Sequence, residues 1–187
     1  MTRSLPTLAL AAAITLLSGC AATVQQPTSA PGAQAAAPAA PIAAPSVASG
    51  RLVVLLTGPA AVMSSADWLA FREEWETSVG AAAAAAKVVA TLPGSEAQIP
   101  ADPAVLARVQ VNDFRYVSQA KRYALGVMAG NAYMDLDVEF LDWPGKRLLG
   151  TRKYATTSSA WHGVFSAMTP KQVEAVSAEI VKTATGQ

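Results

Sequence analysis

The side chains in this sequence with the clearest potential for chemistry are three carboxylates spaced two residues apart. Asp135, Asp137 and Glu139 alternate with apolar residues over 134–140, the pattern of a half-buried strand. On one strand face such carboxylates lie about 6.8 Å apart. A divalent cation needs oxygen ligands converging at about 2.0–2.6 Å, which a flat row does not provide without loops. We therefore predict a solvated, charge-paired face, with a metal site as the less favoured alternative.

Basic partners for this row are predicted from a hairpin turn at Trp143-Pro144-Gly145-Lys146. Proline presets the backbone of the second turn position, and glycine can adopt a positive φ at the third. In a tight hairpin, Asp137 lies opposite Arg152. By the same register Asp142 lies opposite Arg147, so that cross-strand ion pairs neutralise the row.

The single histidine, His162, is the candidate general base for nucleophilic catalysis. A hydrolase would pair it with Ser158 or Ser159 and orient it with a strand carboxylate. The serines lie only three or four residues from the histidine, and no G-x-S-x-G elbow surrounds them. A hydrolase using His162 and the strand carboxylates is therefore an alternative only, and a single histidine argues against a zinc enzyme.

Cys20 is the only cysteine and ends a segment typical of a lipoprotein signal peptide. Residues 1–19 carry one charge, Arg3, and their apolar run is too short to span a bilayer about 30 Å thick. Leu17-Ser18-Gly19-Cys20 has the lipobox pattern: an aliphatic residue, two small residues and cysteine. We predict cleavage before Cys20 and acylation of this residue, so that the lipid holds the chain to a membrane and consumes its only thiol.

The charge of the mature chain limits its partners. Without Arg3, 13 basic and 13 acidic side chains remain, so the formal net charge is zero. A nucleic-acid-binding protein normally carries a basic excess, so no nucleic-acid partner is predicted. Ala21 follows the cysteine, and by resemblance to sorting in enteric-type bacteria the lack of Asp there implies the periplasmic face of the outer membrane.

The chain divides into three parts. Residues 1–19 are the predicted signal peptide, and residues 20–50 carry the lipidated cysteine and an uncharged Ala/Pro-rich stretch. Five prolines interrupt any helix there, so we predict a disordered tether. Residues 51–187 have the length of a single domain with one core.

The first half of that domain shows two strands around one helix. Residues 52–56 form an apolar run typical of a buried strand, and 87–92 predict a second strand. Between them we expect a helix capped by Ser64 or Ser65, with Asp67 in its first turn. The alanines at 81–86 extend this helix through Gly80, with an end at Gly80 as the alternative. Its buried face comprises Trp68, Phe71, Trp75 and Val79.

The second half predicts three further strands and a helix. Residues 105–111 alternate, with a bulge near Asp113-Phe114, and 134–140 and 147–157 form the hairpin. Thr169, with Pro170 next and Gln172 at the third position, begins the last helix in the pattern of a capping box. The stripe buried by this helix comprises Val173, Val176, Ile180, Val181 and Ala184. We predict an α+β fold: a two-layer sandwich of a mostly antiparallel sheet with two helices on one face.

Two clusters are candidate partner-binding sites. The basic residues of 115–122 lie among aromatic side chains that could bind an anionic glycan, a lipid headgroup or a protein, or could simply cover a sheet edge. The segment 161–165 contains large aromatic residues among small ones and could present an anchor or fold under the core. The predicted partner-binding residues are Arg115, Tyr116, Arg122, Trp161 and His162.

Gly126 and Gly130 have the G-x-x-x-G spacing in a segment of small and apolar residues. The segment is too short for a membrane-spanning helix, so close backbone packing is favoured. The alternative is an oligomer that inserts residues 124–134 into the membrane.

Several motifs resemble a known family. They are Val-Asn-Asp-Phe-Arg-Tyr-Val at 111–117, Gly-Val-Met-Ala-Gly-Asn-Ala at 126–132 and Thr-Thr-Ser-Ser-Ala-Trp at 156–161. Over residues 51–185 the chain is similar to the proteobacterial lipoproteins grouped as domain of unknown function 4410.

The turn at 142–146 departs from the D-x-x-T-G-K pattern usual in that family, because Trp143-Pro144 replaces its centre. The family has no assigned activity, so the resemblance implies location and fold and supplies no catalytic residue. Together these features predict an envelope lipoprotein with a non-enzymatic binding or accessory role, needing no cofactor or metal. Its expected partners are the membrane, through the lipid, and an envelope protein or peptidoglycan.

Overall fold

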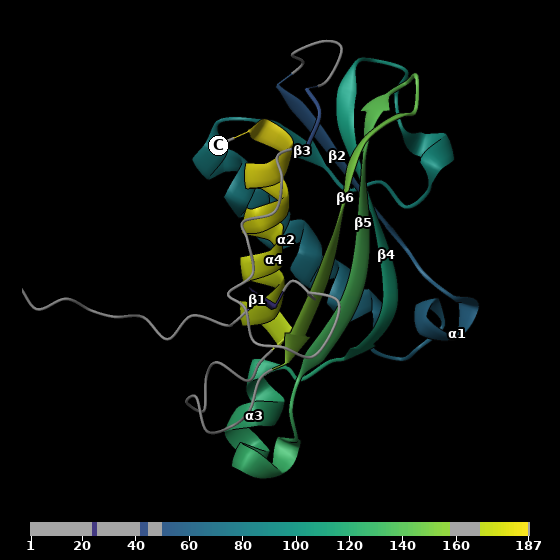
Figure 1. Cartoon of the computed structure of the whole chain (residues 1–187). Coiled ribbons are helices and arrows are strands. Elements are labelled where there is room, and N and C mark those ends of the chain that lie inside the picture. The colour runs from purple at the N-terminus through teal and green to yellow at the C-terminus, as the bar shows by residue number, and fades with distance from the viewer. Residues whose placement is uncertain (1–23, 26–41, 45–49, 158–168, 187) are drawn as a thin grey trace, which may run out of the picture.

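The structure is a computed structural model that describes residues 24–25, 42–44, 50–157 and 169–186 (Figure 1). Within these residues six strands form one sheet in the order β1-β6-β5-β4-β2-β3. The strands are β1 Val24–Gln25, β2 Arg51–Thr57, β3 Val89–Thr91, β4 Ala104–Arg115, β5 Tyr133–Trp143 and β6 Arg147–Thr157. The helices are α1 Ala60–Met63, α2 Trp68–Ala86, α3 Gln119–Leu125 and α4 Thr169–Thr185, with the 3-10 turns η1 Glu96–Gln98 and η2 Gly126–Ala129.

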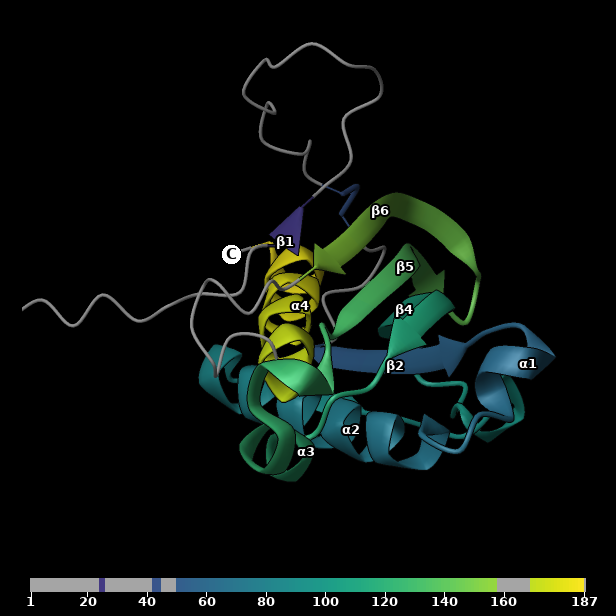
Figure 2. The same cartoon turned by 90° about the horizontal axis from the view of Figure 1, so that it is seen from below.

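The sheet is mostly antiparallel, and the predicted α+β fold is confirmed. β5 pairs antiparallel with both β4 and β6, and β1 pairs antiparallel with β6. β2 pairs parallel with β3 and β4. The two long helices, α2 and α4, lie on the same face of the sheet, and in the described part of the chain the opposite face carries no long helix (Figures 1 and 2).

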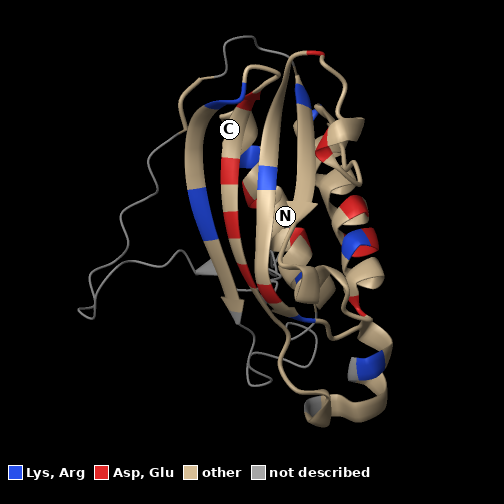
Figure 3. Ribbon diagram, turned by 90° about the vertical axis from the view of Figure 1, so that its right-hand side faces the viewer, with Lys and Arg blue, Asp and Glu red and all other residues tan. Residues whose placement is uncertain are grey.

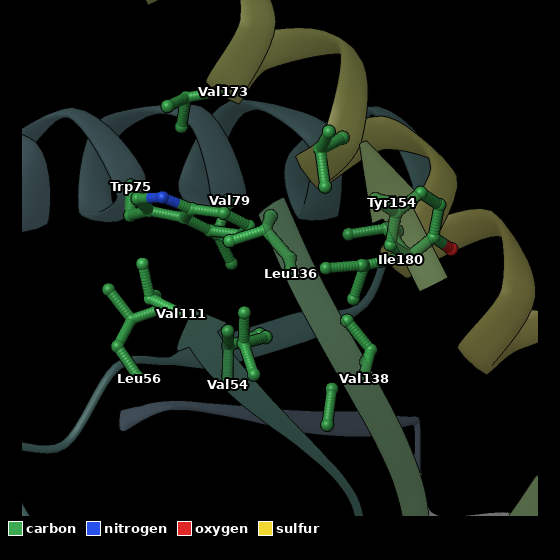
Figure 4. Close-up of a cluster of buried hydrophobic side chains, with 14 of the residues drawn as sticks. Val54, Leu56, Trp75, Val79, Val111, Leu136, Val138, Tyr154, Val173 and Ile180 are labelled. Atoms are coloured by element: carbon green, nitrogen blue, oxygen red, sulfur yellow. The ribbon is translucent and has the colours of Figure 1, made fainter. Parts of the chain in front are cut away.

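The main core fills the space between the sheet and these two helices. Figure 4 shows Trp75 and Val79 of α2 and Ile180 of α4 pointing at the strands. Every second residue of the central strands faces these two helices, including Val54, Val111, Leu136, Val138 and Tyr154. The predicted helix faces are confirmed, except that Ala184 is only partly buried.

The start of α2 differs from the prediction. The helix begins at Trp68, with Asp67 at its N-cap position and no side-chain capping bond. The preceding residues form α1, whose last turn is closed by the Ser64 amide donating to the Ala60 carbonyl at 2.9 Å. Neither serine therefore caps α2, because Ser64 and Ser65 belong to the α1 turn and its exit.

The register of the β5–β6 hairpin also differs in part. Asp142 lies opposite Arg147 as predicted, but Asp137 lies opposite Lys153 rather than Arg152. An irregularity between Phe140 and Leu141 leaves Leu149 as an extra residue on β6. From Gly150 onward, each β6 residue is therefore shifted by one position relative to β5. In the turn, Lys146 adopts the positive φ of 53°, not Gly145, and the Trp143–Pro144 bond is cis.

The predicted bulge in β4 is confirmed. Its register with β5 shifts between Val111 and Asp113. The extra residue returns Phe114 to the helix side of the sheet, where its ring stacks on Phe71 with centroids 4.3 Å apart. The polar residue Asp113 is thereby kept on the opposite face, opposite Asp135.

The predicted capping box at the start of α4 is wrong in its partners. The Thr169 hydroxyl accepts the Val117 amide at 2.8 Å, and the Thr169 amide donates to the Val117 carbonyl at 3.1 Å. The Gln172 side chain donates to the Ala132 carbonyl at 3.0 Å. Thr169 and Gln172 are fully buried, so these side chains join α4 to the chain after β4 and before β5.

Two described stretches of the predicted tether lie along β6. Val24 and Gln25 pair with Thr156 and Ala155 at one end of the strand. Near its other end, the Ala43 amide donates to the Leu149 carbonyl at 2.8 Å. Val24–Gln25 therefore add a short strand beyond β6, whereas residues 42–44 contact the same edge without forming a strand.

Ile42 explains why glycine stands at position 150. A Cβ on Gly150 would lie 2.8 Å from Cγ2 of Ile42. Arg147 also holds this segment against β6, because its guanidinium donates to the Ala44 carbonyl at 3.0 Å.

In the part of the chain that the structure describes, no helix is long and apolar enough to cross a membrane.

Candidate functional site

The three predicted carboxylates lie on the helix-free face of the sheet, within a row of charged and polar side chains. We call this set the polar face: it comprises Arg108, Gln110, Asn112 and Asp113 of β4, Asp135, Asp137 and Glu139 of β5, and Thr151 and Lys153 of β6. Figure 3 shows red carboxylates along the central strand between blue segments on its neighbours. Charge pairing between the strands is therefore present. Arg147 pairs with Asp142 at 3.0 Å as predicted, but Asp137 pairs with Lys153 rather than Arg152.

Lys153 is the centre of one cluster on the polar face. Its Nζ lies 3.7 Å from a carboxylate oxygen of Asp135 and 3.7 Å from one of Asp137. Asn112 donates to the other oxygen of Asp137 at 2.6 Å. The bulge after Phe140 creates this arrangement, because it places Lys153 opposite Asp137.

A second cluster surrounds Glu96, which η1 presents beside the sheet. Arg108 donates to Glu96 at 3.0 Å and to Glu139 at 3.2 Å, and Lys146 donates to the other oxygen of Glu96. The hydrogen bond from Lys146 is the main reason that the pKa of the Glu96 carboxyl is lowered from its usual value. Lys146 also lies over the Trp143 ring, 5.4 Å from its centroid.

These contacts define what the polar face can do chemically. The ion-paired side chains within the polar face, Arg108 with Glu139 and Lys153 with Asp135 and Asp137, are between 31% and 49% exposed, so each pair is screened by water and stabilises the fold by about 1 kcal/mol or less. The carboxylates are oriented by partners across the strands and do not converge on one point. Among the described residues, no group of three His, Cys, Asp or Glu side chains is placed to hold a metal ion.

Next to the polar face, a small second core closes the end of the sheet nearest the β5–β6 turn. The loop before β4 brings Ile99 against Val53, Leu55, Ala104, Leu106 and Leu141. The Trp143 indole donates to the Pro100 carbonyl at 2.7 Å and holds that loop in place. The sequence contains one indication of this second core, the unbroken apolar run of β2. Residues 53 and 55 of that run must face away from the helices and therefore need apolar neighbours on the other face of the sheet.

The predicted partner-binding residues that the structure describes lie on different sides of the sheet. Arg115 lies on the helix-free side and donates to the Ala129 carbonyl at 3.4 Å. Tyr116 packs against the main core near α2, and burial, followed by the charge of Glu74, raises the pKa of its hydroxyl. The side chain of Arg122 and the residues Cys20, Trp161 and His162 lie outside what the structure describes.

Gly130 is required where Arg115 crosses the chain. Its φ is +77°, which L side chains rarely adopt, and a Cβ there would lie 2.5 Å from a guanidinium nitrogen of Arg115. Gly126 also has a positive φ, of +53°, but nothing lies within 4 Å of its added Cβ. The two glycines of the G-x-x-x-G motif thus allow two backbone turns with positive φ, and Gly130 also allows the close approach of the Arg115 side chain.

A group of exposed apolar side chains was not expected as a surface. We call α3 and η2, residues 119–129, the tip. Tyr123 is 63% exposed, Leu125 50% and Met128 87%. The sequence showed a small apolar segment here, but its lack of strict periodicity gave no signal for a helix or for which side chains it would leave exposed.

No family model matches the chain, and no curated protein matches it. Among solved structures, it is similar to a PelC dodecamer from Paraburkholderia phytofirmans, with 11% identity, a TM-score of 0.44, and coverage of 83% of this chain and 96% of that one. It is also similar to protein XCC0632 from Xanthomonas campestris, of the domain of unknown function 330 family, with 14% identity, a TM-score of 0.47, and coverage of 76% and 88%. Because both TM-scores are below 0.5, neither likeness assigns a function to this chain.

Proposed function

We propose that this protein is a lipid-anchored protein of the bacterial envelope, held through Cys20 at the periplasmic face of the outer membrane. Its domain acts as a non-enzymatic binding or accessory module. The resemblance to the lipoproteins of domain of unknown function 4410 is part of this proposal. The lipobox Leu17-Ser18-Gly19-Cys20 supports the anchor.

The polar face is the observation that carries the binding role. Its four carboxylates each contact a partner on a neighbouring strand: Tyr133 for Asp113, Lys153 for Asp135 and Asp137, and Arg108 for Glu139. Asp137, with Asn112 on one oxygen and Lys153 near the other, is already engaged and is poorly placed to orient a catalytic histidine. A flat array of oriented, half-exposed charges suits recognition rather than bond cleavage.

A protein is the partner class that this face favours. An acidic row on β5 lies between Arg108 on β4 and Lys153 on β6, so positive and negative charges alternate across the strands. A protein surface can present the complementary mixed pattern, and such complementarity gives specificity and speeds association. A polymer carrying charge of one sign would meet repulsion at part of this surface.

The anchor is tested by metabolic labelling with radioactive palmitate. We expect the wild-type protein to incorporate label and to fractionate with the outer membrane. Cys20→Ala removes the acceptor thiol, so both the label and the membrane association are expected to be lost. Label retained in Cys20→Ala would contradict the anchor, as would an unlabelled wild-type chain.

The binding face is tested by a photo-reactive residue at Thr151, which is exposed on the polar face. We expect one discrete protein adduct in cells, and we expect Lys153→Glu to reduce its yield at least about tenfold by reversing a central charge. The matched control is the same probe at Leu69, 70% exposed on α2 on the other side of the sheet. A second control, Glu76→Lys on α2, should leave the Thr151 adduct unchanged.

Other outcomes would contradict this binding face. Equal adducts from positions 151 and 69 would show that contact is not directed by the polar face. An adduct made of cell-wall fragments rather than protein would assign the domain to peptidoglycan. Insensitivity of the adduct to Lys153→Glu would remove the charged row from the recognition.

A further inference from the structure

The pairing of β1 fixes which end of the domain faces its anchor. β1 runs antiparallel to β6, with Val24 opposite Thr156 and Gln25 opposite Ala155. The end of β1 that leads back to Cys20 therefore lies at the C-terminal end of β6. The anchor leaves the sheet at this end and not at the β5–β6 turn.

The chain between the anchor and this pairing is short. Four residue steps separate Cys20 from Val24. A fully extended chain spans at most about 3.6 Å per residue, so Cys20 lies within about 14 Å of β1. The acyl chains on Cys20 thus hold the C-terminal end of β6 close to the membrane surface.

The tip lies at the same end of the sheet. Thr157 of β6 pairs with Tyr133 of β5, and Tyr133 pairs with Arg115 of β4. Arg115 in turn donates to the Ala129 carbonyl of η2. Three strand spacings of about 4.8 Å therefore separate β1 from the strand that holds the tip. Figure 1 shows α3 beyond this end of the sheet, opposite the β5–β6 turn.

The chemistry of the tip suits a lipid surface. Three of its large apolar or aromatic side chains are exposed to water: Met128 is 87% exposed, and Leu125 and Tyr123 are half or more exposed. Residues 114–134 contain three basic residues and no acidic one, in a mature chain whose net charge is zero. Apolar and aromatic side chains beside basic ones are typical of segments that lie in the interface of an anionic membrane.

We infer that the tip rests on the bilayer that holds the Cys20 lipid, so that the domain stands with the ends of β4, β5 and β6 toward the membrane. Tyr123, Leu125 and Met128 enter the headgroup region, and the β5–β6 turn points away from it. The polar face then stands roughly perpendicular to the membrane, open to a partner from the side. This orientation rests on the proposed lipidation of Cys20.

The test places an environment-sensitive fluorophore on Met128→Cys in the acylated full-length protein. Acylation consumes the Cys20 thiol, so the introduced cysteine is the only one to react. The matched control is Leu148→Cys, an apolar residue 54% exposed beside the β5–β6 turn at the far end of the sheet. Both proteins are reconstituted into vesicles of phosphatidylethanolamine with a minority of phosphatidylglycerol, with and without spin-labelled lipid.

The expected result is a blue-shifted emission at position 128, at least about twofold stronger than in water, that spin-labelled lipid quenches. Position 148 is expected to stay aqueous and unquenched. A blue shift at position 128 that spin-labelled lipid does not quench would show that the tip contacts a second copy of the chain rather than lipid. That result would overturn the orientation. Aqueous emission at 128, or equal quenching at both positions, would also overturn it.

Mass spectrometry of the same samples separates the two proposals. An acylated chain whose position 128 stays aqueous would overturn the orientation alone. A chain without acyl groups on Cys20 would overturn the proposed anchor, and the orientation with it.

Discussion

Replacing Phe71 with alanine is expected to lower the free energy of unfolding by about 3–5 kcal/mol. Phe71 is fully buried and stands at the centre of an aromatic cluster. Its ring stacks on Phe114 at 4.3 Å and contacts the rings of Trp68 and Trp75 at 5.9 and 6.2 Å. Alanine leaves a cavity that these large rings cannot collapse to fill. Urea denaturation of the domain followed by circular dichroism would measure the change.

The matched control is Leu69→Ala, two residues earlier on α2. Leu69 is 70% exposed, so its truncation removes little buried surface and is expected to change stability by less than about 0.5 kcal/mol. A small domain is stable by only about 5–15 kcal/mol, so Phe71→Ala should visibly lower the urea midpoint. Similar midpoints for the two variants would show that α2 does not pack on the sheet as described.

Replacing Thr169 with valine is expected to cost about 1–3 kcal/mol, because the change keeps the shape but removes the hydroxyl. The buried Val117 amide then loses its acceptor at 2.8 Å. The Arg115 carbonyl also loses a donor, at 3.4 Å. Hydrogen exchange at the Val117 amide should accelerate more than exchange in the central strands, since the opening is local.

Thr185→Val at the other end of α4 is the control for that variant. The Thr185 hydroxyl donates only to carbonyls of its own helix, at 2.9 Å to Val181 and 3.2 Å to Lys182. Its loss is expected to change stability by less than about 0.5 kcal/mol. If the two variants unfolded at the same urea concentration, the bonds between Thr169 and Val117 would have no special role.

The parts of the fold that the sequence predicted are those controlled by burial. Trp68, Phe71, Trp75 and Val79 recur at helical spacing, and all four are buried against the sheet. The alternation over 134–140 likewise placed the carboxylates on one face, because strand geometry permits no other arrangement. Such patterns depend on local periodicity, which the sequence carries directly.

The wrong or missing details depend on contacts between distant residues. The shift that pairs Asp137 with Lys153 follows from the extra residue Leu149, and no local preference marks that position. Thr169 has the sequence pattern of a helix cap, yet its hydroxyl bonds Val117, which lies 52 residues earlier. The exposure of Met128 likewise depends on where the rest of the domain leaves space.

The short pairing of residues 24–25 and 42–44 with β6 has a consequence for self-association. β6 is an eleven-residue outer strand, and long open strand edges are templates on which other chains can add and aggregate. Val24–Gln25 occupies one end of this edge, and Ile42–Ala43, against Gly150, occupies the other. The opposite edge is β3, which at three residues is too short to be a good template. Residues 24–25 and 42–44 therefore shield this edge of the sheet from other copies of the chain, which the proposed lipid anchors would bring close together on a membrane.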